Sequence, residues 1–152
     1  MAPTTPPSAM TKAMKLLAIR PLSEQELWAK LRRAGFPDHE CDAAVAECAR
    51  RHYLDDEQLA ADCVTSLRQR NLGARMIKQK LIRRGLDKER IGEFLAEDPE
   101  AEVEAARRAM EGKLRTLTKE TDPGKKREKL FRFMAGRGFS AGIIFKLLDE
   151  NR

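Results

Sequence analysis

The chain has 152 residues, 36% of them charged and 5% aromatic, with a formal net charge of +6. Abundant Ala, Leu, Glu, Lys and Arg favour helices, and no alternating apolar pattern of useful length indicates strands. The positive charge fits a polyanion or an acidic partner without choosing between them, and no stretch approaches the roughly 20 apolar residues of a membrane-spanning helix.

The amino-terminal stretch "MAPTTPPSAMT" has neither the basic region nor the apolar core of a secretory signal. We expect residues 1–9 to form a disordered tail. The chain has three cysteines, an odd number without the spacing of a disulfide framework or a zinc site, so we expect a cytoplasmic protein.

The first predicted unit spans residues 10–53. A helix over about residues 12–20 precedes a second helix, which starts at the S-x-x-E capping box of Ser23 and Glu26. The second helix ends near Gly35, and Pro37 and Asp38 start a third. Trp28 follows the core residue Leu27, which favours packing over a role as a binding anchor.

In the third helix Cys41, Cys48 and His52 share one stripe with Val45. A metal site there would need a further ligand, and buried thiols behave as small hydrophobic groups. We therefore interpret the stripe as core, and we expect no metal and no cofactor.

The second predicted unit spans residues 54–97. Its first helix, over about residues 56–70, starts at Asp55 and Asp56, acidic residues that suit a helix start. The next helix ends near Gly85, and Asp87 caps the one after it.

The third predicted unit spans residues 98–152. A helix over about residues 100–117 is followed by a helix that starts at Asp122 and Pro123 and ends near Gly138. Ser140 caps the last helix.

One motif ends the second helix of each unit: "LRRAGF", "LIRRGL" and "MAGRGF", with glycines at 35, 85 and 138. Each glycine is predicted to be left-handed, where only Gly escapes the Cβ clash. Phe36 should then contact Leu31, Leu86 should contact Leu81, and Phe139 should contact Met134. The recurrence predicts an all-α fold of three tandem three-helix repeats forming an elongated, curved solenoid.

The stretch "YLDDEQLAADCVTSLRQRNLGARMIKQKLIRRGL" resembles the RecX family of regulators of the RecA recombinase, in its Leu-Asp-Asp opening, its G-x-x-x-I segment and its L-x-x-[KR]-G close. "LSEQELWAKLRRAGF" and "LFRFMAGRGFSAGII" resemble the first and third repeats of the family. Leu59 and Cys63 depart from the pattern, because they stand where family members often carry Phe.

The resemblance implies a protein without catalytic activity that acts mainly as an inhibitor of the RecA filament on single-stranded DNA. It implies binding along the filament groove, which limits filament extension, ATP hydrolysis, strand exchange and repressor cleavage, and so modulates recombinational DNA repair and the SOS response. We expect a monomer whose main partner is RecA, with weak contact to single-stranded DNA as a second expectation.

The densest basic stretch, from Cys63 to Leu86, contains no acidic residue. At 100° per residue, Arg75, Lys78 and Arg83 should lie opposite the core-facing Ile77 and Leu81. Smaller basic patches occur in the outer units. The full set of candidate partner-binding residues is Arg32, Arg33, Arg68, Arg70, Arg75, Lys78, Lys80, Arg83, Arg84, Lys125, Lys126, Arg127 and Lys129.

No phosphate-binding loop, nucleophile elbow or paired-carboxylate motif is visible, so the sequence does not indicate an enzyme. Two alternatives stay open: a nonspecific basic nucleic-acid-binding helical protein, and an adaptor for an unrelated acidic protein. Few aromatic residues stand among the arginines, which favours protein over single-stranded DNA as the first partner.

Overall fold

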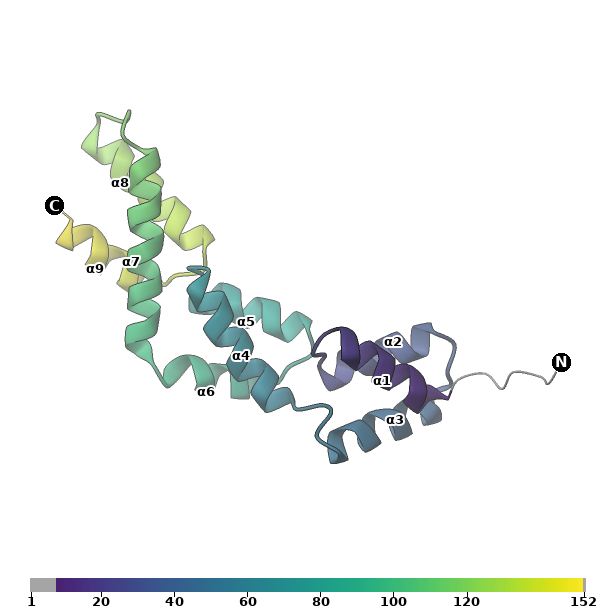
Figure 1. Cartoon of the computed structure of the whole chain (residues 1–152). Coiled ribbons are helices and arrows are strands. Elements are labelled where there is room, and N and C mark those ends of the chain that lie inside the picture. The colour runs from purple at the N-terminus through teal and green to yellow at the C-terminus, as the bar shows by residue number, and fades with distance from the viewer. Residues whose placement is uncertain (1–7, 152) are drawn as a thin grey trace. The chain divides into compact units, whose positions relative to one another are not determined.

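A computed structural model describes residues 8–151, and within this range the secondary structure is entirely helical (Figure 1). The expected all-α fold is therefore confirmed. The helices are α1 (Ala9–Ile19), α2 (Glu24–Arg33), α3 (Asp38–Arg50), α4 (Asp56–Gln69), α5 (Ala74–Arg83), α6 (Lys88–Ala96), α7 (Pro99–Thr116), α8 (Pro123–Gly136) and α9 (Ala141–Glu150).

The beginning of α1 corrects the expected tail. Residues 1–7 lie outside the described part of the chain, but Ser8 caps the helix and Ala9 is its first residue. The Ser8 hydroxyl accepts a hydrogen bond from the backbone N–H of Thr11 at 3.1 Å, and Ala9 is buried. A serine cap satisfies an N–H group that the helix cannot satisfy itself, so the helix starts at Ala9, before the expected start near residue 12.

The described residues form two compact units rather than three separate ones. Unit 1 holds residues 8–60 and 83–86, and unit 2 holds residues 61–82 and 87–151. The helices follow one another as three sets of three along the chain. The repeat boundaries at residues 53 and 97 remain a prediction.

The core of unit 1 lies among α1, α2 and α3. Ala13, Leu27, Leu31 and Cys41 have no exposed surface. The predicted capping box is present, because Ser23 accepts from the N–H of Glu26 at 3.0 Å and the Glu26 carboxylate accepts from the N–H of Ser23 at 2.9 Å. This cap fixes the start of α2 and therefore the face that α2 buries.

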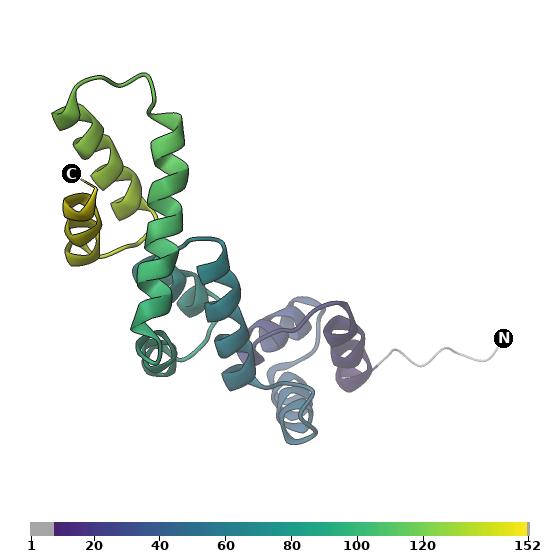
Figure 2. The ribbon, with the colours of Figure 1, turned by 60° about the vertical axis from the view of Figure 1, so that its left-hand side comes forward.

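In unit 2, helices α7, α8 and α9 pack beside one another (Figure 2). Their shared core contains Ala105, Met110, Met134 and Ile144, all nearly or fully buried. Asp122 caps α8 and Ser140 caps α9, as expected from the sequence. Within the described residues, none of the helices combines the length and the apolar character needed to cross a membrane.

The three repeated glycines are left-handed as predicted, with φ of 105° at Gly35, 84° at Gly85 and 97° at Gly138. In the first repeat, Phe36 donates to the carbonyl of Leu31 at 3.3 Å and Gly35 donates to Arg32 at 3.1 Å. The third repeat has the same pair of bonds. This is the Schellman pattern that closes a helix on a left-handed residue.

Two further left-handed residues were not anticipated: His52 after α3 and Asn71 after α4, with φ of 60° and 63°. Tyr53 donates to Cys48 at 2.8 Å and Leu72 donates to Leu67 at 3.2 Å, so both helices also close in the Schellman manner. Without a glycine, the sequence carried little signal for these two turns.

Candidate partner-binding surface

The thirteen basic side chains expected to face a partner divide by their contacts into internal, ion-paired and unpaired groups. The internal group donates hydrogen bonds to other segments of the chain, which the sequence did not predict. The unpaired ones define the surface that remains available for a partner.

Arg68 is internal, with 7% of its surface exposed. Its guanidinium donates to the carbonyl of Leu95 at 2.8 Å and lies 3.9 Å from the Glu102 carboxylate. The expectation that Arg68 faces a partner is wrong because it lies four residues after the buried Val64, on the inner face of α4. Its Nε is buried without a hydrogen-bond partner among the described residues.

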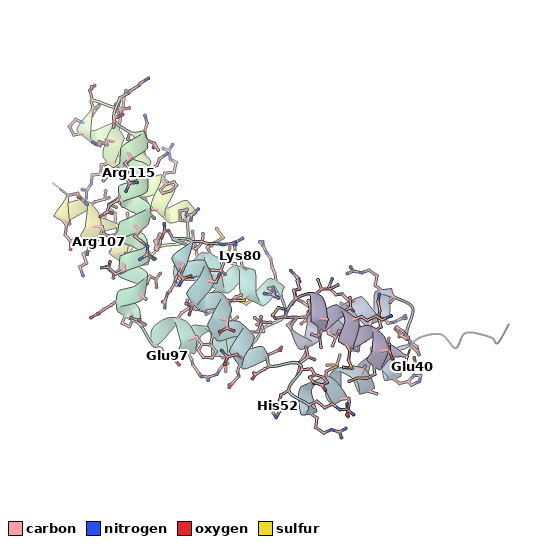
Figure 3. The ribbon with its side chains drawn as sticks, in the orientation of Figure 1. Glu40, His52, Lys80, Glu97, Arg107 and Arg115 are labelled. Carbon is pink, nitrogen blue, oxygen red and sulfur yellow. The ribbon has the colours of Figure 1, made fainter. Side chains whose placement is uncertain are left out.

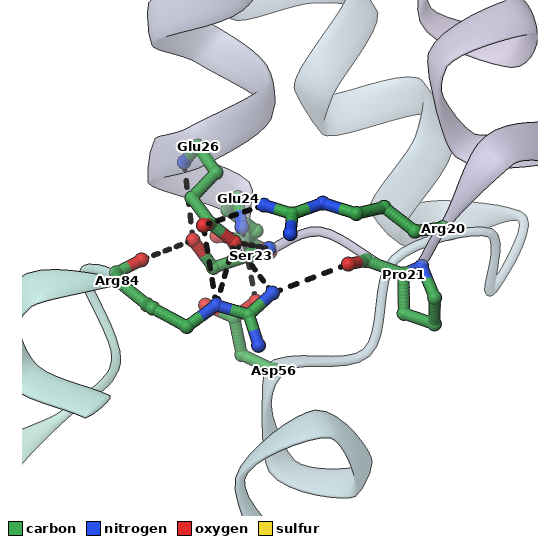
Figure 4. Close-up of polar contacts among 7 residues, drawn as sticks. All are labelled: Arg20, Pro21, Ser23, Glu24, Glu26, Asp56 and Arg84. Carbon is green, nitrogen blue, oxygen red and sulfur yellow. Dashed lines mark hydrogen bonds and ion pairs between the residues drawn. The ribbon is translucent and has the colours of Figure 1, made fainter. Parts of the chain in front are cut away.

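Arg84 is also engaged within the protein, in the group of polar contacts drawn in Figure 4. Its Nε and Nη2 donate to the Glu26 carboxylate at 2.9–3.2 Å, and Nη2 also donates to the carbonyl of Pro21 at 3.2 Å. The Ser23 hydroxyl donates to the backbone carbonyl of Arg84. Arg84 therefore ties the turn at Gly85, between α5 and α6, to the start of α2, and a role for it in binding a partner stays a prediction.

Burial, hydrogen bonds and nearby charges shift the pKa values of two acids near Arg84. Burial alone would raise the pKa of Glu26, but hydrogen bonds from Arg84 and from the Ser23 N–H, with the charges of Arg84 and Arg20, hold it below its ordinary value. The pKa of Asp56 is raised by burial and by nearby acids, although its carboxylate accepts from the N–H of Glu24 at 3.0 Å. Asp56 therefore caps α2, a tertiary role beyond its own helix start.

Arg75 is exposed, as its position on α5 predicted, but it is not free. Its Nη2 donates to the carbonyl of Ala135 at 2.7 Å, and its backbone N–H donates to Gly138 at 3.2 Å. The sequence placed Arg75 on the outer arc of α5 without showing that the end of α8 lies against that arc. The guanidinium thus helps to hold α5 against the turn at Gly138, between α8 and α9.

Three candidate residues form exposed ion pairs. Arg32 lies 2.7 Å from Asp38, Arg127 lies 3.2 Å from Asp149, and Lys129 lies 2.7 Å from Glu120, in each case between charged atoms. Exposed pairs of this kind contribute only about 0–1 kcal/mol, so a partner can displace them at small cost. Their charge is nevertheless partly neutralised.

The other candidate cations have side chains without a hydrogen bond or ion pair to any described residue. Three of them lie on α5, and the side chain of Lys80 extends away from that helix in Figure 3. We call Lys78, Lys80 and Arg83 the α5 cations. The complete unpaired group is Arg33, Arg70, Lys78, Lys80, Arg83, Lys125 and Lys126.

Two arginines that the sequence did not single out complete the end of α4. Arg137 donates to the carbonyls of Arg70 at 2.5 Å and Asn71 at 3.2 Å. Arg108 donates to the Asn71 side chain at 2.8 Å and to the carbonyl of Arg68 at 3.1 Å. They satisfy helix-end carbonyls, a role that depends on tertiary contacts and has no local sequence signal.

Trp28 and the cysteines have structural surroundings. The indole N–H donates to the Asp42 carboxylate at 2.7 Å, and the ring packs against the core of unit 1. Cys41 and Cys48 are buried, which raises the pKa of both thiols. His52 is exposed, and the described residues contain no group of three or more His, Cys, Asp or Glu side chains placed to hold a metal ion.

Two family models match the chain. The model of the first three-helix domain of RecX matches residues 9–48, and the model of the third matches residues 100–148. These segments contain α1 to most of α3 and most of α7 to α9.

Similar proteins of comparable length are named "Regulatory protein RecX". The protein from Chlorobaculum tepidum is 34% identical over 87% of this chain and 81% of its own, and that from Vibrio campbellii is 32% identical over 91% and 87%. A crystal structure of RecX from Lactobacillus salivarius matches 93% of each chain with a TM-score of 0.84 and 20% identity, which supports the tandem-repeat fold. The chain belongs to the RecX family of regulatory proteins.

Proposed function

We propose that this protein regulates the RecA recombinase filament on single-stranded DNA, mainly as an inhibitor of its extension and ATP hydrolysis, of strand exchange and of repressor cleavage. Membership of a family of regulatory proteins supports a regulatory role. The observation that carries the proposal is the set of α5 cations, which have no internal partner and stand in a stretch without acidic residues. Such side chains can meet an acidic protein surface at little cost in lost internal contacts.

Simultaneous contacts from more than one repeat would explain how individually weak surface charges can give a stable complex with the filament. Arg33 in the first repeat, the α5 cations in the second, and Lys125 with Lys126 in the third are all unpaired. When one repeat docks, the others are held at a high effective concentration near the next filament subunit. The proposed mechanism is therefore multivalent binding along the filament groove, without chemistry by this chain.

The test is ATP hydrolysis by RecA on single-stranded DNA, titrated with this protein below one copy per recombinase subunit. We expect strong inhibition at that ratio, with little binding to naked DNA. Reversal of two α5 cations, Lys80→Glu with Arg83→Glu, should raise the half-inhibitory concentration about tenfold or more, as loss of an interface contact typically does. Lys15→Glu, a reversal at an exposed residue of α1 outside the candidate set, is the matched control.

The alternative function, nonspecific nucleic-acid binding, makes the opposite prediction. Inhibition would then appear only when the protein covers the DNA, and affinity for naked DNA would fall steeply with salt through counterion release. That result would replace the proposed function.

A further inference from the structure

The third repeat contains two adjoining hollows between α8, α9 and the end of α7. One, of about 420 Å³, is lined by residues that include Leu114, Lys126 and Leu130. The other, of about 300 Å³, is lined by residues that include Phe131 and Phe145. Gly124, Arg127 and Leu148 line both, so the hollows form one depression, which we call the α8/α9 groove.

The floor of the α8/α9 groove is apolar. Leu130 and Leu148 are buried beneath it, whereas Phe145 leaves 48% of its surface exposed. The Phe145 and Phe131 rings lie 5.1 Å apart between centroids, tilted by 32°. A large exposed ring held in place by a neighbouring ring presents apolar surface with little further loss of side-chain freedom on binding.

The charged residues that line the groove are two cations, Lys126 and Arg127, and one acid, Glu128. Lys126 lines the groove without an internal partner, Lys125 precedes Lys126, and Arg127 lies beside it in an exposed pair with Asp149. The first turn of α8 carries no acidic residue, as is also true of α1, α5 and α9. The electrostatic complement of this groove is therefore a large apolar side chain flanked by carboxylates.

From this complementarity we infer that the α8/α9 groove is a docking site for an acidic amphipathic segment of a partner protein, which inserts an aromatic or aliphatic anchor against Phe145 and pairs its carboxylates with Lys126 and Arg127. The inference rests on the proposed function, because the docking segment is taken to belong to a RecA subunit. It adds a specific apolar contact to binding that would otherwise depend on surface charge.

A protein segment fits this groove better than a nucleic acid does. The hollow beside the end of α7 is lined by the aliphatic residues Leu114, Leu130 and Leu148, which complement an inserted apolar side chain, whereas single-stranded nucleic acid normally needs a series of aromatic faces along its backbone track. One acid, Glu128, also lines the groove, and its carboxylate is paired with Arg132 at 3.0 Å. Binding of naked single-stranded DNA is kept as an outcome of the test.

The test uses the full chain in the ATP hydrolysis assay with RecA on single-stranded DNA. Phe145→Ser and Lys126→Glu should each raise the half-inhibitory concentration about tenfold, the scale of an interface anchor. The controls are Met14→Ser, at a residue of α1 that is 46% exposed, and Lys15→Glu, and both should inhibit like the unmodified chain. Raising the salt concentration should shrink the effect of Lys126→Glu and leave that of Phe145→Ser, because only the first acts through charge.

Thermal denaturation followed by circular dichroism checks that each variant is folded. If Phe145→Ser does not fold, Lys126→Glu still decides the test. If the unmodified protein inhibits and both groove variants inhibit equally well, the groove inference is overturned while the proposed function stands. If the unmodified protein does not inhibit, both fail. If the groove variants lose affinity for naked single-stranded DNA to the same extent, the site binds nucleic acid and the protein docking site is refuted.

Discussion

We call the glycine turns between α2 and α3, α5 and α6, and α8 and α9 the first, second and third joints. The first and third joints are built from the same motif, yet they have different surroundings. Gly35 and Gly138 are both left-handed, and both helices close with the same pair of backbone bonds. A Cβ added at Gly35 would meet nothing within 4 Å, whereas at Gly138 it would lie 2.5 Å from the backbone nitrogen of Met76. The motif determines the left-handed turn. The segment packed against the glycine determines whether a side chain there would also clash.

The third joint is docked through its backbone. Gly73 donates to the carbonyl of Arg137 at 2.9 Å, and Arg75 donates to Gly138 at 3.2 Å, so the start of α5 is hydrogen-bonded to the turn after α8. The first joint has no such contact with another helix start among the described residues. Equal substitutions at the two joints should therefore have unequal costs.

The largest expected effect is that of Gly138→Ala. A left-handed non-glycine residue costs about 1–2 kcal/mol and a packing clash about 1–3 kcal/mol more, so the loss of stability should be about 2–5 kcal/mol. Chemical denaturation followed by circular dichroism measures it. Gly136→Ala, where an added Cβ meets open space within α8, is the control, and a similar loss there would refute the packing argument.

The second joint should come next, because its neighbour Arg84 holds a partly buried acid. Arg84→Met removes the bonds to Glu26 and to the carbonyl of Pro21, and we expect a loss of about 1–3 kcal/mol, as for hydrogen bonds to charged groups. Arg83→Met deletes the adjacent unpaired cation and should change the free energy of unfolding by less than about 0.5 kcal/mol. Equal losses in the two variants would contradict the internal role of Arg84.

Gly35→Ala should cost only the backbone term, about 1–2 kcal/mol, because there is no clash to add. The comparison with Gly138→Ala under one denaturation protocol isolates the packing contribution. If Gly35→Ala proved as costly as Gly138→Ala, the two joints would not differ in the way the structure indicates.

A smaller effect of opposite sign is expected at the joint after α3, where the exposed His52 is left-handed. His52→Gly removes the Cβ clash and should stabilise the chain by about 0.5–1 kcal/mol after the entropic cost of glycine. Asn71→Gly is the informative contrast, because it also deletes the side chain that accepts from Arg108. A thermal melt of the two variants would show the gain only for His52→Gly.

The smallest expected effect is a dependence of stability on pH around the second joint. The pKa of Glu26 in the folded chain lies below its ordinary value of 4.5, so its contribution is present above that value and is lost as the pH falls through the folded pKa. Glu26→Gln should therefore differ from the unmodified chain more at pH 6 than in the acid range. Denaturation curves at several pH values measure this, and a constant difference between the two proteins would contradict it.

Much of the local architecture was readable from the sequence. The left-handed glycines, the capping box of Ser23 and Glu26, and the caps at Asp87, Asp122 and Ser140 follow from residue types whose backbone preferences and hydrogen bonds act within a few positions. The periodic apolar residues likewise identified the buried faces of the helices.

The basic surface could not be assigned in the same way, because the sequence does not show which acid or carbonyl group lies next to a given basic side chain. Arg68, Arg75 and Arg84 have the same local signal as Lys80 and Arg83, yet each of the three donates to a backbone carbonyl on another segment. By itself the sequence determined the helical class, the three glycine turns and most of the helix caps, since those preferences are local, but not the start of α1 or the turns at His52 and Asn71. Only the tertiary structure decided which cations are internal and which are free to bind, because that depends on acids and carbonyls brought close from distant parts of the chain.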